Sequence, residues 1–247
     1  MNNLVIICAI LLLVLLFLKV PVYIAVLSAS AVYFIGTPGM NLSIFAQKTI
    51  SGAEGLSLLA IPFFVCAGIF MNYTGVTKRI MNCCEVLTAR MPGGLAQVNI
   101  LLSTLMGGLS GSSLADAAMQ CKMLVPTMES KGYSKSFSTV ITAASGMVVP
   151  LIPPGVGLII YGCINNISIG KLFIAGIGPG IVLCVTLMIF THFLSKKRGY
   201  LPSRTTKIPV SEKIAAVRPA FLPLLLPIII IGGVRIGVFT ASEAGTV

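Results

Sequence analysis

The sequence Gly-Gly-Leu-Ser-Gly-Ser-Ser-Leu-Ala-Asp-Ala-Ala, residues 107–118, lies inside an apolar stretch that spans residues 95–121. Lipid tolerates continuous helices, so a run of small and hydroxyl residues at membrane depth predicts an interrupted helix. The backbone groups that such a break releases need protein, water or a ligand as partners. A broken helix of this kind is a sequence signal for an ion or substrate site in a membrane carrier.

A second interruption follows at residues 145–155, Ser-Gly-Met-Val-Val-Pro-Leu-Ile-Pro-Pro-Gly, within the apolar stretch 136–164. Proline lacks a backbone N–H and clashes with the preceding turn. Pro153 and Pro154 are therefore expected to end a helix and to free the carbonyl groups upstream. Two interruptions in one apolar region indicate a binding site.

The composition places the chain in a membrane. Of its 247 residues, 56% are hydrophobic and 9% are charged, whereas a soluble domain carries about 25% charged residues. The sequence therefore predicts an all-α integral membrane protein, a bundle of several spans. The net charge of +11 would suggest nucleic acid in a soluble protein, but here it follows from basic loops between apolar segments. The lipid bilayer is the expected partner, and no nucleic acid is expected.

Seven apolar segments are candidates for membrane helices. They lie at residues 4–18, 21–36, 56–72, 95–121, 136–164, 170–194 and 216–235. The first is read as a retained helix, because no basic residue precedes it and no cleavage site follows it. The first two are joined at Val20-Pro21 and should form a tight hairpin, and Pro62 should kink the third.

Basic residues decide how the interrupted stretch 95–121 is folded. The predicted loops 73–92 and 122–135 each carry three Lys or Arg residues, so both are expected on the cytoplasmic side. The chain then enters and leaves on one face, which makes the stretch a re-entrant hairpin. The resulting topology puts 14 of the 17 basic residues inside and the N-terminus outside.

Residues 19–25 and 235–241 are similar, and this topology gives them opposite orientations. Such a pair is typical of an inverted repeat. Thr240 and Glu243 have the spacing of a capping box, which begins a helix. The sequence is therefore expected to hold the first of two repeats, with a second repeat of similar length missing.

Several passages together resemble one family, the large membrane subunit (DctM-like) of tripartite ATP-independent periplasmic (TRAP) transporters. The matching passages are Leu59–Phe64 with Ala67-Gly68, Gly107–Asp116, Met147–Gly155 and Gly237–Ala244. The resemblance covers essentially the whole chain and corresponds to the first half of the family's subunit plus the opening of the second. It implies a sodium-coupled elevator transporter in the bacterial inner membrane, where the outside N-terminus that the charges predict is periplasmic.

The resemblance also implies how the chain is divided and what it works with. Residues 1–92 would supply scaffold-type helices and a cytoplasmic connection, and residues 93–194 a transport-type region. That region would contain the hairpin 93–122, the broken helix 136–164 and the helix 170–194, followed by a basic cytoplasmic linker at 195–215 and a truncated second repeat at 216–247. The implied partners are a small four-helix membrane subunit, a periplasmic substrate-binding protein, and an organic acid such as a C4-dicarboxylate, sialic acid or another sugar acid.

No permanently bound cofactor is expected, and sodium is the implied coupling ion. Family sodium sites lie between a hairpin tip and the neighbouring broken helix, and here these positions are Ser110, Gly111, Ser112, Ser145, Gly146, Val148 and Pro150. Sodium prefers oxygen ligands, as calcium and magnesium do, and serine hydroxyls and freed carbonyls supply them. The expected substrate-binding residues are Ser113, Asp116, Pro153 and Pro154, since half-helix N-termini suit a carboxylate.

Three other readings stay open or are excluded on chemical grounds. An ion channel also uses re-entrant loops, and an inactive membrane fragment is a further alternative. An enzyme is not expected, because an intramembrane aspartyl protease needs two facing carboxylates and only Asp116 lies at depth. A serine protease needs a base beside its nucleophile, and His192 is predicted near the cytoplasmic surface.

Overall fold

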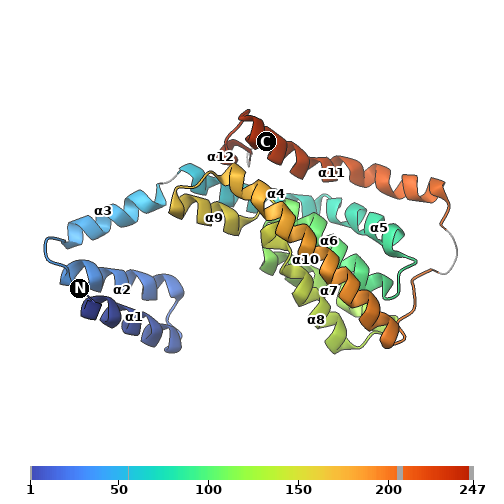
Figure 1. Ribbon diagram of the computed structural model, residues 1–247, viewed down its shortest axis with the longest axis horizontal. Helices are drawn as coiled ribbons and strands as arrows, with labels where there is room; N and C mark the ends of the chain where they lie inside the picture. Colours follow the sequence, from blue (N-terminus) through green and yellow to red (C-terminus); the bar gives the residue numbers. More distant parts are fainter. Residues whose placement is uncertain (1, 55, 205–207, 245–247) are drawn as a thin grey trace. The chain divides into compact units, whose positions relative to one another are not determined.

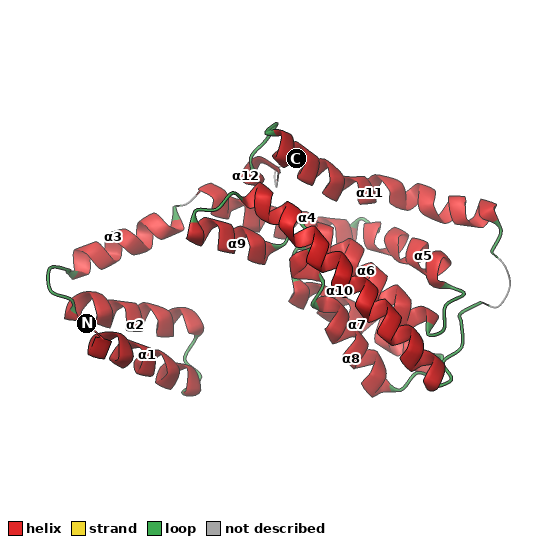
Figure 2. Ribbon diagram, in the orientation of Figure 1, coloured by secondary structure: helices red, strands yellow, loops and turns green. Residues whose placement is uncertain are grey.

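The computed structural model describes residues 2–54, 56–204 and 208–244, and every regular element in those ranges is a helix (Figure 2). The predicted all-α class is confirmed. Both predicted interruptions are also present, one between helices at residues 111–112 and one at residues 147–155. The chain divides into two compact units, Met1–Gly55 and Leu56–Val247. The division into scaffold-type and transport-type regions stays a prediction.

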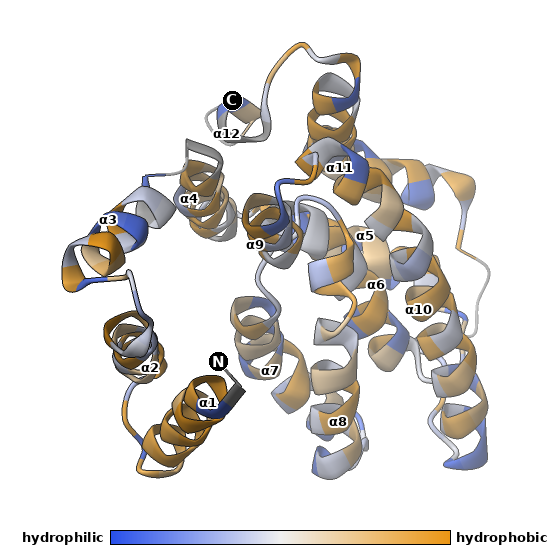
Figure 3. Cartoon of the chain, turned by 60° about the vertical axis from the view of Figure 1, so that its left-hand side comes forward, coloured by the Kyte–Doolittle hydropathy of each residue, from blue (hydrophilic) through white to orange (hydrophobic). Residues whose placement is uncertain are grey.

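The first unit begins with the expected hairpin. Helices α1 (Asn2–Phe17) and α2 (Val22–Gly36) pack together, and Pro21 occupies the N-cap of α2. Most residues of α1 are hydrophobic (Figure 3). Most of its described side chains are exposed, as expected of a helix that faces lipid. A third helix, α3 (Leu42–Ala53), was not predicted, because its mixed composition has no long apolar run.

Among the described residues of the second unit, two helices are long and apolar enough to cross a membrane, α10 (Ile169–Lys197) and α11 (Val210–Ile236). Two bent pairs also meet this test when each is taken as one span. The first joins residues 60–71 of α4 (Ala60–Tyr73) to α5 (Val76–Thr88) with a bend of 70°. The second joins residues 135–151, which begin with α8 (Lys135–Gly146), to α9 (Val156–Asn165) with a bend of 41°. The second pair is the broken helix that the sequence predicts.

Helix α6 (Gly94–Ser110) forms the centre of the second unit. It contacts α4, α5, α8 and α10, as well as its hairpin partner α7 (Ser113–Ser130) (Figure 1). All residues from Gly93 to Ile100 are buried, so polar side chains in this stretch must find partners inside the bundle.

The two loops that the charges predicted are mostly helical. α5 occupies most of residues 73–92, and α7 continues through Pro126 to Ser130, well beyond the expected end at residue 122. The basic side chains of α5 lie on its exposed face, while Ile80 and Cys84 are fully buried. The basic residues correctly indicated that these segments have an exposed surface. They could not distinguish a loop from an amphipathic helix, because both expose such residues.

Pro62 is not in the interior of a helix. A 3₁₀ turn, η1 (Leu56–Leu59), precedes α4, and Pro62 lies in the first turn of α4. The first turn needs no N–H from that residue, so the expected mid-helix kink is replaced by a helix start.

The basic linker is shorter than predicted and its first part is docked. α10 ends at Lys197 and α11 begins at Val210; residues 205–207 lie outside the described residues. The Tyr200 carbonyl accepts a hydrogen bond from Gly93 N at 3.2 Å, and Arg204 N donates to the Ala89 carbonyl at 2.9 Å. The linker therefore lies against the turn between α5 and α6.

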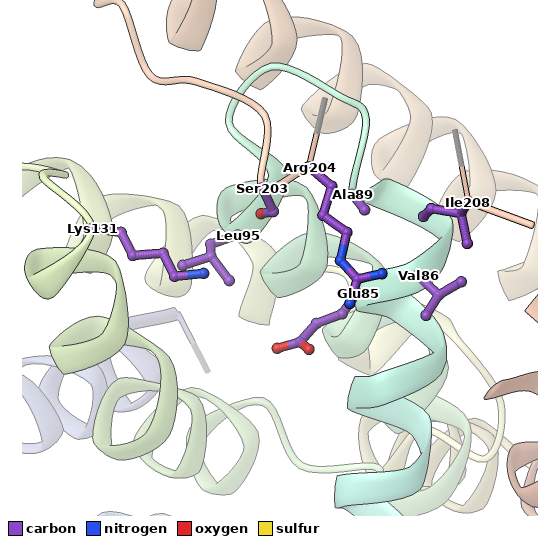
Figure 4. Close-up of a pocket in the computed structure, with 8 residues that line it drawn as sticks. All are labelled: Glu85, Val86, Ala89, Leu95, Lys131, Ser203, Arg204 and Ile208. Carbon is purple, nitrogen blue, oxygen red and sulfur yellow. The ribbon is translucent and has the colours of Figure 1, made fainter. Parts of the chain in front are cut away.

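A small polar hollow separates this linker from α5 and the end of α7 (Figure 4). Glu85, Lys131 and Arg204 contribute its charged groups. Arg204 also forms an ion pair with Glu212 at 2.5 Å. The hollow mixes both signs of charge and contains none of the predicted site residues.

Candidate functional site

The tip of the hairpin is built by a glycine and a serine. Gly111 has φ +59°, the left-handed conformation that glycine adopts without a steric penalty, and its N–H donates to the Gly107 carbonyl at 3.2 Å. Ser112 then takes an extended conformation as the N-cap of α7, and its side chain accepts from Ala115 N at 3.5 Å. One helix ends and the next begins within two residues, which makes the tip sharp.

The second interruption is a longer irregular segment. α8 ends at Gly146, a 3₁₀ turn η2 (Val149–Leu151) contains Pro150, and α9 begins after Gly155. Pro153 and Pro154 lie between η2 and α9, so no helix runs through them. The position and length of this break agree with the sequence prediction.

The hairpin tip lies directly against this break. Val156 is the first residue of α9, and its N–H donates to the Gly111 carbonyl at 3.2 Å. A Cβ atom on Gly111 would lie 2.5 Å from the Pro154 carbonyl oxygen, so only glycine allows this approach. The N-termini of α7 and α9 therefore meet at the tip, and two positive helix ends converge there.

A second contact joins the other side of the tip to the end of α8. An added Cβ on Gly146 would lie 3.5 Å from the Ser113 carbonyl oxygen and 3.4 Å from Ala117 Cβ. Gly146, Gly111, Ser113 and Pro154 are thus brought together. Whether they hold sodium or substrate stays a prediction.

The predicted serines have different surroundings. Ser110 is 8% exposed and its Oγ has no hydrogen-bond partner. Ser112 caps α7. Ser145 is fully buried, and its Oγ lies 3.0 Å from Ser103 Oγ and 2.8 Å from Asn99 Oδ1 on α6. The Ser145 side chain is therefore engaged with α6.

At two other predicted positions, Val148 and Pro153, the structure records contacts of backbone groups. Val148 is buried, and its N–H donates to the Ser145 carbonyl at 3.0 Å. The Pro153 carbonyl oxygen would lie 3.1 Å from a Cβ on Gly108, so this carbonyl faces α6 close to the tip.

A buried polar network connects α6, α7 and α8, and sequence reasoning missed most of it. Its members occupy positions four residues apart, or nearly so, on each helix: Asn99 and Ser103, Asp116 and Gln120, and Ser138, Thr142 and Ser145. Residues four apart lie on one helix face. A polar stripe of this spacing on an apolar helix is the signal that could have found the network.

Four buried side-chain oxygens on the described residues of the two hairpin helices have no hydrogen-bond partner: Gln97 Oε1, Ser110 Oγ, Asp116 Oδ1 and Gln120 Oε1. Buried polar atoms are nearly always paired, so each of these oxygens lacks the donor or cation that a buried oxygen ordinarily has. Hydroxyl, carboxylate and amide oxygens are the ligands that hard cations prefer. The oxygen atoms present in the hairpin therefore fit a sodium ion better than a soft metal.

The chain matches the family model described as "Tripartite ATP-independent periplasmic transporter, DctM component" over residues 9–247. It is 41% identical over 233 residues to the sialic acid TRAP transporter large permease protein SiaM of Vibrio cholerae, covering 94% of this chain and 54% of that protein. The 2,3-diketo-L-gulonate TRAP transporter large permease protein YiaN of Escherichia coli is 40% identical over 227 residues, 92% of this chain and 53% of that protein.

A third relative is named for ectoine. The ectoine TRAP transporter large permease protein TeaC of Halomonas elongata is 37% identical over 232 residues, 93% of this chain and 54% of that protein. The chain thus spans about half the length of these curated relatives.

Proposed function

The chain belongs to the DctM component family of tripartite ATP-independent periplasmic transporters, and from this membership we propose that it forms part of the large permease subunit of such a transporter. The family is one of transporters, so the chain is a membrane transport protein and not an enzyme. The whole subunit would import an organic acid across the bacterial inner membrane. A small four-helix membrane subunit and a periplasmic substrate-binding protein would complete the system.

The relatives favour one substrate class. Two of them are named for sialic acid and for 2,3-diketo-L-gulonate, and both compounds are carboxylates derived from sugars. We propose a sugar acid ahead of a C4-dicarboxylate. A carboxylate is the group that the two helix N-termini meeting at Gly111 are suited to bind, and Ser113, Asp116, Pro153 and Pro154 surround or adjoin that position.

The observation that carries the proposal is the contact between the two interruptions, Val156 N to the Gly111 carbonyl at 3.2 Å. It joins the beginning of α9 to the tip that precedes α7, and the approach of Gly146 to the Ser113 carbonyl adds the end of α8. We propose that sodium binds there, with Ser110, Gly111, Ser112, Ser145, Gly146, Val148 and Pro150 as the candidate ligand positions. Sodium binding would then couple to an elevator movement, with the N-terminus on the periplasmic side.

The experiment is uptake of labelled sialic acid and diketogulonate by the complete transporter in proteoliposomes. Uptake should require a sodium gradient and the binding protein, and potassium should not replace sodium. Ser110→Leu should raise the sodium concentration needed for half-maximal uptake. Thr139→Val removes an exposed hydroxyl from α8 that bonds only within its own helix, and it should leave the sodium dependence unchanged.

Three results would contradict parts of this proposal. Equal uptake in potassium would remove sodium coupling. Uptake without the binding protein would remove the tripartite assignment. Wild-type sodium dependence in Ser110→Leu would remove the tip from the sodium site. An ionic current without substrate would instead support the channel alternative.

A further inference from the structure

The hollow between the linker, α5 and the end of α7 lies at the base of the hairpin, away from its tip (Figure 4). Its volume is about 210 Å³, which is room for several water molecules at about 30 Å³ each. Its polar side chains are Glu85 on α5, Lys131 at the end of α7, and Ser203 and Arg204 of the linker. These residues belong neither to the buried polar network nor to the hairpin tip, so the hollow is a separate feature.

Backbone contacts fix the wall of the hollow that the linker contributes. Arg204 N donates to the Ala89 carbonyl at 2.9 Å, which holds the linker against the end of α5. A Cβ atom on Gly94 would lie 2.5 Å from Ser203 Oγ, so the serine hydroxyl lies directly against the first residue of α6. The linker is therefore packed closely on both helices that border the hollow.

One part of the hollow offers donors that suit a phosphate. Leu95 lines it from the first turn of α6, and the N–H groups at the start of a helix lack partners within the helix and favour an anion. Among the described residues, the Lys131 ammonium forms no ion pair and the Ser203 hydroxyl forms no hydrogen bond. A helix start, an ammonium group and a hydroxyl group are thus all available at this position.

The charges around the hollow have both signs. Arg204 is paired with Glu212, so the uncompensated charges of the lining are those of Lys131 and Glu85. Neither of these two side chains takes part in an ion pair within the part of the chain that the structure describes. A ligand with only a negative group would also approach the Glu85 carboxylate, and like charges repel. A ligand with one negative and one positive group gives both side chains a partner.

We propose that the hollow binds a phosphoethanolamine group. Its phosphate accepts hydrogen bonds from Lys131, Ser203 and the start of α6, and charge-assisted bonds of this kind are the strong ones. Its ammonium group donates to the Glu85 carboxylate. A choline group has a positive charge but no N–H donor, and a glycerol group has no charge. The hollow therefore distinguishes headgroups by charge and by hydrogen-bond donors.

A membrane lipid and a soluble compound can both present this group. The basic residues predict that this end of the bundle is cytoplasmic, and basic pockets between membrane helices on that side bind lipid headgroups. Leu87 and Leu201, close in sequence to lining residues, are 50% and 78% exposed, which provides apolar contacts for acyl chains. These observations favour phosphatidylethanolamine. Its headgroup would join α5, α7 and the linker, and this binding does not depend on the proposed transport function.

The test measures the melting temperature of the complete, delipidated transporter in detergent during titration with short-chain phosphatidylethanolamine. Phosphatidylglycerol and phosphatidylcholine with the same acyl chains, and soluble phosphoethanolamine, are titrated in parallel. Phosphatidylethanolamine should bind about tenfold more tightly than the other two lipids, the factor expected for one charged hydrogen bond. Stabilisation by the lipid alone identifies the source as the membrane, and equal stabilisation by phosphoethanolamine identifies it as a soluble compound.

Single substitutions assign the contacts. Lys131→Met should weaken binding of phosphatidylethanolamine about tenfold. Glu85→Gln should abolish the preference over phosphatidylglycerol, because the repelling carboxylate is gone. The matched controls are Lys122→Met and Glu129→Gln, which remove the same charges from exposed positions on α7 and should bind like the wild type. Native mass spectrometry counts the bound lipid in each variant.

Three results would overturn this site, whether or not uptake requires sodium. Wild-type affinity in both Lys131→Met and Glu85→Gln would show that the hollow binds no headgroup. Phosphatidylglycerol binding at least as tightly as phosphatidylethanolamine to the wild type would refute the role of Glu85 and, with it, the zwitterionic ligand. An equal loss of affinity in Lys122→Met and Lys131→Met would show general attraction to a basic surface in place of a defined site.

Discussion

Replacing Tyr200 should release the linker between α10 and α11 from the base of the hairpin. The Tyr200 ring stacks on Tyr133 with ring centroids 4.4 Å apart and lies 5.0 Å from the Phe137 ring. Its hydroxyl oxygen accepts from Ser134 N at 3.2 Å and lies 3.3 Å from Ser134 Oγ. These contacts, which we call the Tyr200 clasp, join the linker to the turn between α7 and α8.

The magnitude follows from these contacts. Each aromatic pair contributes about 0.5–1.5 kcal/mol beyond its burial, and a hydrogen bond about 0.5–1.5 kcal/mol net. Tyr200→Phe removes only the hydroxyl and should cost about 1 kcal/mol. Tyr200→Ala removes both ring contacts as well and should cost about 3 kcal/mol. With about 1.4 kcal/mol per factor of ten, the open linker should become about fivefold more populated in the first variant and about 100-fold in the second.

Tryptic cleavage after Lys197, Arg198 and Arg204 measures this opening on the folded transporter. When opening and closing are fast relative to cleavage, the cleavage rate follows the population of the open form. Tyr161→Ala is the control, because Tyr161 lies on α9 with its side chain 54% exposed. Wild-type cleavage in Tyr200→Ala would refute the clasp, and equal rates in Tyr200→Phe and Tyr200→Ala would refute the contribution of ring stacking.

Three further predictions concern the tip, the network and alkaline pH. Gly111→Ala should lower the free energy of unfolding by about 1–2 kcal/mol, the cost of placing alanine in a left-handed conformation. Its Cβ would also meet the Pro154 carbonyl, which adds to that cost. The control Gly157→Ala, whose Cβ would meet no atom within 4 Å, should not lower the melting temperature. Ser145→Ala should cost about 1–3 kcal/mol, since Asn99 Oδ1 loses its donor, and chemical unfolding would show no such loss if the network were unimportant. Burial raises the pKa of the Tyr133 hydroxyl above its ordinary value, so the fold favours its neutral form. The resulting contribution to the free energy of unfolding is complete below about pH 10 and falls as the pH rises further. This fall should be smaller in Tyr133→Phe.

The interruptions were predictable from sequence because glycine, serine and proline act locally. Gly111 needs no distant partner to take a positive φ, and the consecutive prolines Pro153 and Pro154 withhold two backbone N–H groups that a continuing helix would use. α5 was not predicted because its apolar residues form a periodic pattern and no continuous run. Its buried residues Ile80, Cys83 and Cys84 have the spacing of one helix face, so the signal was present in the sequence.

The network was harder to predict because it depends on tertiary packing. Asn99 and Thr142 are separated by 43 residues along the chain, and each alone is an ordinary polar residue. Ser145 was proposed as a sodium ligand because it lies next to the break. In the structure its hydroxyl bonds to Ser103 and Asn99 on α6, partners that its position in the sequence does not reveal.

This packing bears on the proposed elevator mechanism. The chain of hydrogen bonds crosses from α7 through α6 to α8, and buried residues of α6, α8 and α10 form one apolar cluster that includes Ile100, Phe137 and Cys184. Separating these helices would expose several buried polar groups to lipid, at about 1–3 kcal/mol for each unpaired group. Under the proposed mechanism, α6, α7, α8 and α10 should therefore move as one body. A cysteine crosslink between α6 and α8 should therefore preserve uptake. Loss of uptake on crosslinking this pair would mean that the hairpin separates from the broken helix during transport.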